Sequence, residues 1–414
     1  MSTRTLIPAL ALLAGTCLAQ DAQTLPLRVL IDRNLDRQLI ELVSIDDTHI
    51  TYVDTAGSRV NAPRDAFVAL APIDAWDSAQ AAGNVFNQGR MISRPGVLEL
   101  TDGQRFVGTA SVADAGEEMI AWNYPRLGLI SIPLENVTRI VLPRIMNADQ
   151  ARPPLAVEDD DVLRLANGDT LRGFLASYGS TTTIELDDGS TIDTPINVLD
   201  EITLANPTQA PSGMRLWLTG GNIVDAQSIS PSDRPDTRAQ IITLKEDPIS
   251  PFGAASAASE ADDTQSGLRF EIGREMIEAI SFDAEALIPL AAIEARAMGR
   301  ALTINNTSTA ALGARDISMP GPMTATWPIP RGSTRLAFTA ELPIEARAWG
   351  NLELIILVDG SERQRHTLSA QSPEAHVRLD IENARDLTIT LDEGDFGPVQ
   401  DRVTIREAVL LIGR

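Results

Sequence analysis

A stretch of alternating apolar residues interrupted by two tight-turn signals, residues 162–204, limits the fold more than any other feature of the chain. It starts with VLRL, in which leucines alternate with other residues at the period of a half-buried strand. The pairs Asn167-Gly168 and Asp188-Gly189 are typical of hairpin turns, because these residue types tolerate positive φ. Four or five short strands in about 45 residues predict a small, strongly bent β-barrel.

The same spacing returns along the first two thirds of the chain. Segments 98–108, 163–173 and 216–226 share two leucines, a glycine, an apolar residue and a final glycine or alanine. That final position is Gly173 in the clearest copy, where a missing side chain suits a bulge or a sharp bend. Four small β-barrel repeats are therefore predicted, at residues 25–72 (repeat 1, degenerate), 96–143 (repeat 2), 161–206 (repeat 3) and 213–285 (repeat 4, with a flexible insertion at about 247–267).

Corresponding residues in successive repeats are unevenly spaced, which disfavours a solenoid of constant period. We therefore expect separate barrels joined by polar linkers, with residues 73–95 as a spacer. The alternative is one continuous β-structure in which neighbouring repeats share sheets. In their turn glycines and apolar spacing, the repeats resemble small barrels of the Sm and Src-homology-3 type, a likeness that implies a fold and no activity.

Residues 300–414 show a different pattern of apolar and polar residues. Their alternating stretches are longer and predict the strands of a β-sandwich of the jelly-roll type. The Phe338 strand, the Val358-Asp359-Gly360 hairpin, the run at 377–391 and the closing strand at 401–411 resemble the NPCBM domain. That family has a galactose-binding-like β-sandwich and occurs beside glycosidase domains. The predicted fold class is all-β, with tandem small barrels followed by this sandwich.

Residues 1–19 have the pattern of a secretory signal peptide. Arg4 supplies the positive start, residues 6–13 form an apolar segment too short to span a bilayer, and Ala19 offers a small-residue cleavage site. We expect export to the periplasm, the cell surface or the extracellular space. A lipid anchor at Cys17 is the alternative. Cys17 is the only cysteine, so the predicted mature chain has no disulfides and no thiol chemistry.

Charge restricts the partners. The formal net charge is −23, and a surface of this sign repels the phosphates of nucleic acids, so no nucleic-acid partner is expected. After the leader no segment approaches the 18 apolar residues that a membrane span requires, so no membrane insertion is expected after signal cleavage.

Few residues suggest catalysis. The three histidines lie in unrelated segments, and no nucleophile-elbow, phosphate-loop or paired-histidine motif is present. We expect no catalytic residues and no enzyme, although the abundant carboxylates leave open a glycosidase-type pair located between domains.

The candidate binding residues all lie in the sandwich. Trp349, in the ARAWGN turn, and Trp327 are candidates for contact with a sugar ring. Asp392, Asp395 and Asp401 surround an acidic turn and form a candidate Ca²⁺ site, because Ca²⁺ prefers several closely spaced carboxylates. No other cofactor is expected.

Three functions are compatible with these features. The leading interpretation is an exported, non-enzymatic modular protein whose repeats act as spacers or protein-binding modules and whose last domain is carbohydrate-binding-like, with a glycan or a cell-envelope protein as partner. The first alternative is a module that binds a cell-wall or environmental polysaccharide. The second is a glycoside-active enzyme with a site between domains.

The leader gives the first testable prediction: the exported protein begins at Gln20, because Ala19 ends the cleavage-site pattern. Intact-mass measurement of the secreted chain checks this. A retained leader, or a lipid-bearing Cys17, would contradict it.

Overall fold

The computed structural model describes residues 27–72, 91–111, 118–147, 153–156, 158–232, 239–245, 248–251, 268–304, 311–394, 397 and 401–413. Over these ranges the ordered elements are β-strands and one-turn 3-10 helices, so the all-β prediction is confirmed. In the same ranges no helix is long and apolar enough to cross a membrane. The leader, most of the 73–95 spacer, most of the 247–267 insertion and Asp395 lie outside the described residues.

The four repeats share one order of elements: four strands, a one-turn 3-10 helix and a fifth strand, with one additional two-residue strand in repeat 4. In each repeat the first strand pairs with the second and the fifth, the second with the third, and the third with the fourth, always antiparallel. The likeness to Sm and Src-homology-3 barrels remains a prediction.

The strand bounds are as follows. Repeat 1 holds β1 (Leu27–Asp32), β2 (Arg37–Ile45), β3 (His49–Asp54), β4 (Arg59–Pro63) and β5 (Phe67–Pro72); repeat 2 holds β7 (Gly96–Leu100), β8 (Arg105–Ala110), β9 (Met119–Tyr124), β10 (Gly128–Pro133) and β11 (Val137–Val141). Repeat 3 holds β13 (Asp161–Leu165), β14 (Thr170–Ser177), β15 (Thr181–Glu185), β16 (Thr191–Pro195) and β17 (Leu199–Thr203); repeat 4 holds β18 (Met214–Leu218), β19 (Asn222–Pro231), β20 (Ala239–Leu244), β22 (Arg269–Gly273) and β23 (Ile277–Ser281). The short strands β6 (Met91–Arg94) and β12 (Arg144–Asn147) pair with each other beside repeat 2.

The two turn signals of repeat 3 form hairpin turns with positive φ, as predicted. Gly168 has φ 101° and Gly189 has φ 77°. The Asp188 carboxylate accepts the backbone N–H of Ser190 at 2.9 Å, a local bond that favours the turn.

Gly173 marks a sharp change of partner in β14. The strand pairs with β13 up to Gly173 and with β15 from Phe174 onward. A Cβ at Gly173 would overlap the carbonyl oxygen of Glu185, and one at Gly108 in repeat 2 would overlap the carbonyl oxygen of Asn123. The bend predicted from the repeated glycine is confirmed, and close backbone approach is its physical cause.

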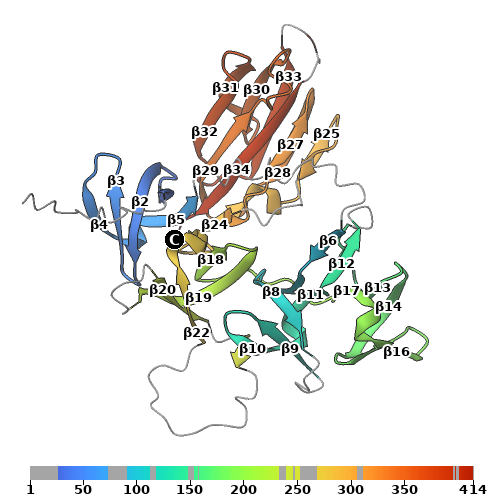
Figure 1. The fold of residues 1–414 in the computed structure, drawn as a ribbon. Helices are drawn as coiled ribbons and strands as arrows, with labels where there is room; N and C mark the ends of the chain where they lie inside the picture. The colour runs from blue at the N-terminus through green and yellow to red at the C-terminus, as the bar shows by residue number, and fades with distance from the viewer. Residues whose placement is uncertain are drawn as a thin grey trace, which may run out of the picture.

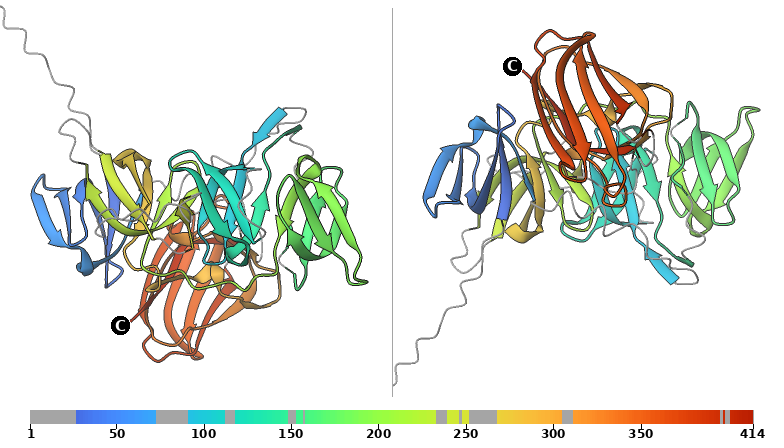
Figure 2. Two further views of the ribbon diagram at one scale, coloured as in Figure 1. Left: turned by 90° about the horizontal axis from the view of Figure 1, so that it is seen from below. Right: turned by 90° about the horizontal axis from the view of Figure 1, so that it is seen from above.

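The repeats do not stand in chain order. Figure 2 shows them in a row in the order 1, 4, 2, 3, with the sandwich beside the middle of the row. Strand pairs join the neighbours: β5 to β23, β19 to β8, and β11 to β17. The expectation of separate barrels joined only by linkers is therefore wrong, because strands of neighbouring repeats have backbone edges that pair with each other.

Burial strengthens this pairing. The facing residues Leu70 and Ile280 are fully buried, as are Ile140 and Ile202 at the other junction. Buried side chains of all four repeats form one continuous apolar cluster. The repeats thus share sheets and core instead of closing separate cores.

The sandwich consists of two antiparallel sheets. One runs β26 (Thr303–Ile304), β27 (Ile317–Pro320), β34 (Arg402–Ile412), β29 (Ser333–Glu341), β32 (Glu374–Asp380), with β24 (Leu287–Pro289) also paired to β34. The other runs β25 (Arg296–Met298), β28 (Met323–Pro328), β33 (Asp386–Glu393), β30 (Asn351–Val358), β31 (Ser361–Ser369). Because β24 and β25 belong to these sheets, the sandwich begins before residue 300.

A second apolar cluster attaches the sandwich to repeats 1 and 4. It joins Val68 and Trp217 of the repeats to Ala337, Val409 and Leu411 of the sandwich. Ion pairs from Arg37 to Glu407 and from Arg378 to Asp36 lie in the same contact. One end of the sandwich is therefore held on the repeats, and the opposite end points away from them (Figure 1).

The bend at Gly173 gives the second prediction. We expect Gly173→Ala to lower the free energy of unfolding by roughly 1–3 kcal/mol, because the new methyl group displaces the Glu185 backbone. Gly179→Ala is the matched control, since its Cβ would meet nothing closer than 3.8 Å. Urea unfolding of the two variants decides: equal midpoints would contradict the close-approach explanation.

Candidate functional site

The end of the sandwich farthest from the repeats gathers several strand ends. Cross-strand register places Met323 opposite Leu391, Leu352 opposite Glu393, and Pro320 opposite Arg402. The loop at residues 343–350 leads into β30 at this same end. We call this the distal end; it is the uppermost part of the sandwich in Figure 1.

The 343–350 loop exposes two large apolar side chains. Ile344 is 70% exposed and Trp349 is 66% exposed. The loop is nonetheless well braced: Gly350 donates its N–H to the Ala346 carbonyl at 2.7 Å, and Arg347 donates to the Leu342 carbonyl at 3.0 Å. Trp349 therefore presents its indole from a hydrogen-bonded turn, where a ring face is open to a ligand.

Two features of the loop hold this turn. A Cβ at Gly350 would lie 2.8 Å from the Ala346 carbonyl oxygen, so only glycine fits without a shift. Glu341 accepts hydrogen bonds from Arg347 and Arg406, both at 2.7 Å, which ties the loop to β29 and β34.

Trp327 does not share this position. It is 1% exposed and lies between the two sheets, in line with the buried Met323 and Ala325 of β28. The suggestion that it contacts a ligand is corrected: alternation along β28 turns this ring into the core, where no face is left for a sugar.

The acidic turn is only partly described. Asp401 is buried, and burial raises the pKa of its carboxyl against the opposing effect of a hydrogen bond from the Asn351 backbone. Asp392 is exposed and follows the inward-facing Leu391, so it points to the outer side of its sheet. Asp395 lies outside the described residues.

Within the described ranges no group of three metal-binding side chains is present. Asp401 by itself offers one buried carboxylate, which does not make a Ca²⁺ cage. The Ca²⁺ site at Asp392, Asp395 and Asp401 therefore stays a prediction.

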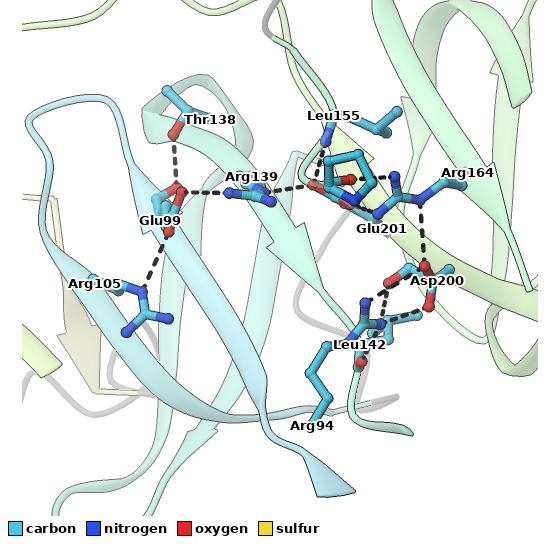
Figure 3. Close-up of polar contacts among 11 residues, drawn as sticks. Arg94, Glu99, Arg105, Thr138, Arg139, Leu142, Leu155, Arg164, Asp200 and Glu201 are labelled. Carbon is cyan, nitrogen blue, oxygen red and sulfur yellow. Dashed lines mark hydrogen bonds and ion pairs between the residues drawn. The ribbon is translucent and has the colours of Figure 1, made fainter. Parts of the chain in front are cut away.

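A second charged site, between repeats 2 and 3, was missed from the sequence. Asp200 and Glu201 follow one another on β17, and their side chains are 6% and 1% exposed. In Figure 3 they lie among arginines from several strands. Adjacent buried carboxylates between domains are the arrangement to check for a glycosidase-type pair.

Asp200 binds three arginines. Its Oδ1 lies 2.6 Å from Arg94 Nη2 and 3.0 Å from Arg144 Nε, and its Oδ2 lies 3.3 Å from Arg164 Nε. Arg94 also donates to the carbonyl of Leu142 at 3.0 Å. Both carboxylate oxygens are therefore neutralised by guanidinium groups.

Glu201 is equally occupied. Its Oε1 accepts from Arg139 Nε at 2.6 Å and from the Leu155 N–H at 3.1 Å, while its Oε2 is paired with Arg164. Arg139 also forms an ion pair with Glu99 on β7, and Glu99 in turn pairs with Arg105 on β8 (Figure 3). Every oxygen of this carboxylate pair is bound to an arginine or to a backbone N–H, and the cluster joins repeats 2 and 3.

The sequence carried only a weak signal for this cluster. Asp200 and Glu201 stand between the apolar Leu199 and Ile202, a pattern that equally suits a solvated strand face. Arg164 on β13 lies opposite Glu201 through pairing within repeat 3, whereas the arginines of β6, β11 and β12 reach the pair through the junction of β11 with β17.

No family model matches the chain, and no curated protein matches it. Among solved structures, the chain is similar to a CBM51 module from Clostridium perfringens GH95 in complex with methyl-galactose (10% identity, 30% of this chain and 99% of that one, TM-score 0.27). It is also similar to the tandem CBM51 modules of a family 98 glycoside hydrolase from Streptococcus pneumoniae (10% identity, 80% and 95%, TM-score 0.27) and to a family 35 carbohydrate-binding module from Clostridium thermocellum (13% identity, 29% and 97%, TM-score 0.20). Likenesses at these scores say nothing about the ligand of this chain.

The ion cluster gives the third prediction. Glu201→Gln should lower the free energy of unfolding by about 3–5 kcal/mol, because Arg139 and Arg164 then lose a buried counter-charge. Glu99→Gln is the control: its side chain is 32% exposed, and we expect a loss of about 1 kcal/mol or less. Denaturant unfolding measures both. Similar losses in the two variants would show that the cluster is not the junction described here.

Proposed function

We propose that this protein is an exported, non-enzymatic glycan-binding protein. Its sandwich binds the sugar at the distal end through Trp349, and its four repeats form the support that holds this end outward. The observation that carries the proposal is the 66% exposure of Trp349 on a braced loop, at the end of the sandwich opposite the repeats.

An exposed tryptophan suits a sugar for a physical reason. Its flat apolar face covers the C–H face of a pyranose ring, and its N–H remains available as a hydrogen-bond donor. Ile344 extends the apolar surface on the same loop. The exposed pair Glu345 and Arg402, 4.0 Å apart, supplies polar groups nearby for sugar hydroxyls. Apolar rings and a few polar groups together are what a ligand site requires.

The attachment of the sandwich supports the role of the repeats. Apolar contact from Val68 and Trp217, together with the Arg37–Glu407 pair, covers one end of the sandwich. Shared sheets make the row of repeats continuous. A glycan bound at the distal end would therefore be held at a fixed distance from whatever surface the repeats contact.

The non-enzymatic part of the proposal rests on the state of the Asp200–Glu201 pair. Its oxygens are all bound to arginines or to a backbone N–H. Turnover of chromogenic glycosides by the mature chain would overturn this part alone, since a binding site at Trp349 does not depend on it.

The fourth prediction concerns the ring. A glycan array identifies the sugar bound by the mature chain, and calorimetry with that sugar then compares variants. Trp349→Ala should weaken binding by roughly tenfold or more, as expected for an aromatic residue at the centre of an interface. Ile145→Ala, which removes another exposed apolar side chain (73%) beside repeat 2, should leave the affinity unchanged.

Both variants should unfold at the wild-type temperature, because both side chains are exposed. An array without a bound glycan, or equal affinities for wild type and Trp349→Ala, would contradict the proposed function.

A further inference from the structure

In one repeat, the free edge of the sheet is already paired with a short strand from another repeat. In repeat 2 the fourth strand, β10, pairs on its outer side with β21 (Ser250–Pro251), which comes from repeat 4. The register sets Ser131 opposite Ser250, and the Ser250 hydroxyl donates to the Ser131 carbonyl at 3.3 Å. This edge therefore accepts an extended segment from elsewhere.

Repeat 3 has the same edge without such a strand. Its fourth strand is β16, and in the described part of the chain β16 pairs only with β15. The Leu186 N–H donates to the Ser190 carbonyl, and the Ile196 N–H donates to the Ser180 carbonyl. Because hydrogen-bonded and non-hydrogen-bonded pairs alternate along the β15–β16 ladder, Thr191 and Asp193 point their backbone N–H and C=O groups away from β15. Asp193 lies two residues before Pro195, as Ser131 lies two residues before Pro133.

A hollow of about 240 Å³ lies on the face of the same sheet. Its lining consists of Asp159, Asp160, Asp161, Gly173, Phe174, Glu185, Leu186, Asp187 and Ala205. Phe174 is 67% exposed, and register places Phe174, Glu185 and Thr191 in one row across β14, β15 and β16. Glu185 is thus one strand spacing, roughly 5 Å, from the free strand β16, and Phe174 is two, roughly 10 Å.

In the part of the chain that the structure describes, the carboxylates of the hollow form no ion pairs. The Asp161 carboxylate accepts the N–H groups of Leu175 and Ala205, both at 2.8 Å, and so belongs to the framework. The other four carboxylates of the lining are exposed. The nearest arginine on the strand, Arg172, is paired with Glu158.

We propose that the β16 edge and this hollow bind an extended, basic segment of a partner protein by strand addition. The segment's backbone pairs with the outward groups of Thr191 and Asp193, and one of its lysine or arginine side chains points along the sheet face toward the Glu185 carboxylate. Repeat 3 stands at one end of the row of repeats (Figure 2).

The open edge of repeat 1 does not suit the same partner. Its β4 pairs only with β3 in the described residues, but it begins with Arg59 and is followed by Arg64. Those cations repel a basic segment. Repeat 1 therefore provides a matched control within the same chain.

The test uses the mature full-length chain and a fluorescent nine-residue synthetic peptide in which lysine alternates with valine. We expect it to bind at about 150 mM salt, near physiological ionic strength, while the same peptide with glutamate in place of lysine does not. The double variant Glu185→Lys/Asp187→Lys should weaken binding by roughly tenfold or more. Asp193→Pro removes one outward N–H without touching the ladder to β15 and should act similarly; Asn61→Pro, the equivalent change in β4, should have no effect.

Residue-resolved hydrogen exchange gives a second readout on the wild-type chain. The amides of Thr191 and Asp193 should be slowed by the lysine peptide, and this result stands even if Asp193→Pro fails to fold. Absence of binding, binding that survives the charge reversal, or protection at other amides would overturn the proposal.

Discussion

Antiparallel pairing between the outer strands of different repeats is the interaction on which the architecture depends. A small barrel with five strands leaves backbone donors and acceptors at its edges, and each must find a partner or face water. Here β11 pairs with β17 and β5 with β23, and the residues that face one another are buried. Because these contacts join repeats that are distant in sequence, the repeats stand in the order 1, 4, 2, 3. The sandwich packs on repeats 1 and 4.

The buried ion pairs between repeats 2 and 3 depend on this strand pairing. β13 of the same repeat already places Arg164 opposite Glu201, and the other arginines join the Asp200–Glu201 cluster where β17 lies beside β11. Buried ion pairs of this kind add little net stability, but they penalise any arrangement that leaves one charge alone. The cluster thus fixes how repeat 3 sits on repeat 2, while burial of apolar side chains supplies most of the driving force.

The same geometry divides the surface of the molecule by role. The sandwich uses one end for attachment, so Trp349 at the other end remains exposed. Repeat 2 has its fourth-strand edge covered by Ser250–Pro251, whereas in the described residues the fourth strand of repeat 3 has no such partner and the face of its sheet carries carboxylates beside an exposed phenylalanine. Repeats with the same order of strands therefore expose different edges and side chains to a partner.

Local chemistry was predictable from the sequence. Alternating leucines set the strands, Gly168 and Gly189 set the turns, and the repeated glycine at 173 marked the bend, because each depends on residues close in the chain. The exposure of Trp349 and the burial of Trp327 needed the structure, since alternation does not say which face of β28 packs inward. The order of the repeats, their shared sheets and the arginine cluster were also decided by tertiary structure alone. A strand edge carries the same backbone groups whatever its sequence, so the pattern of side chains does not predict which strand will pair with it.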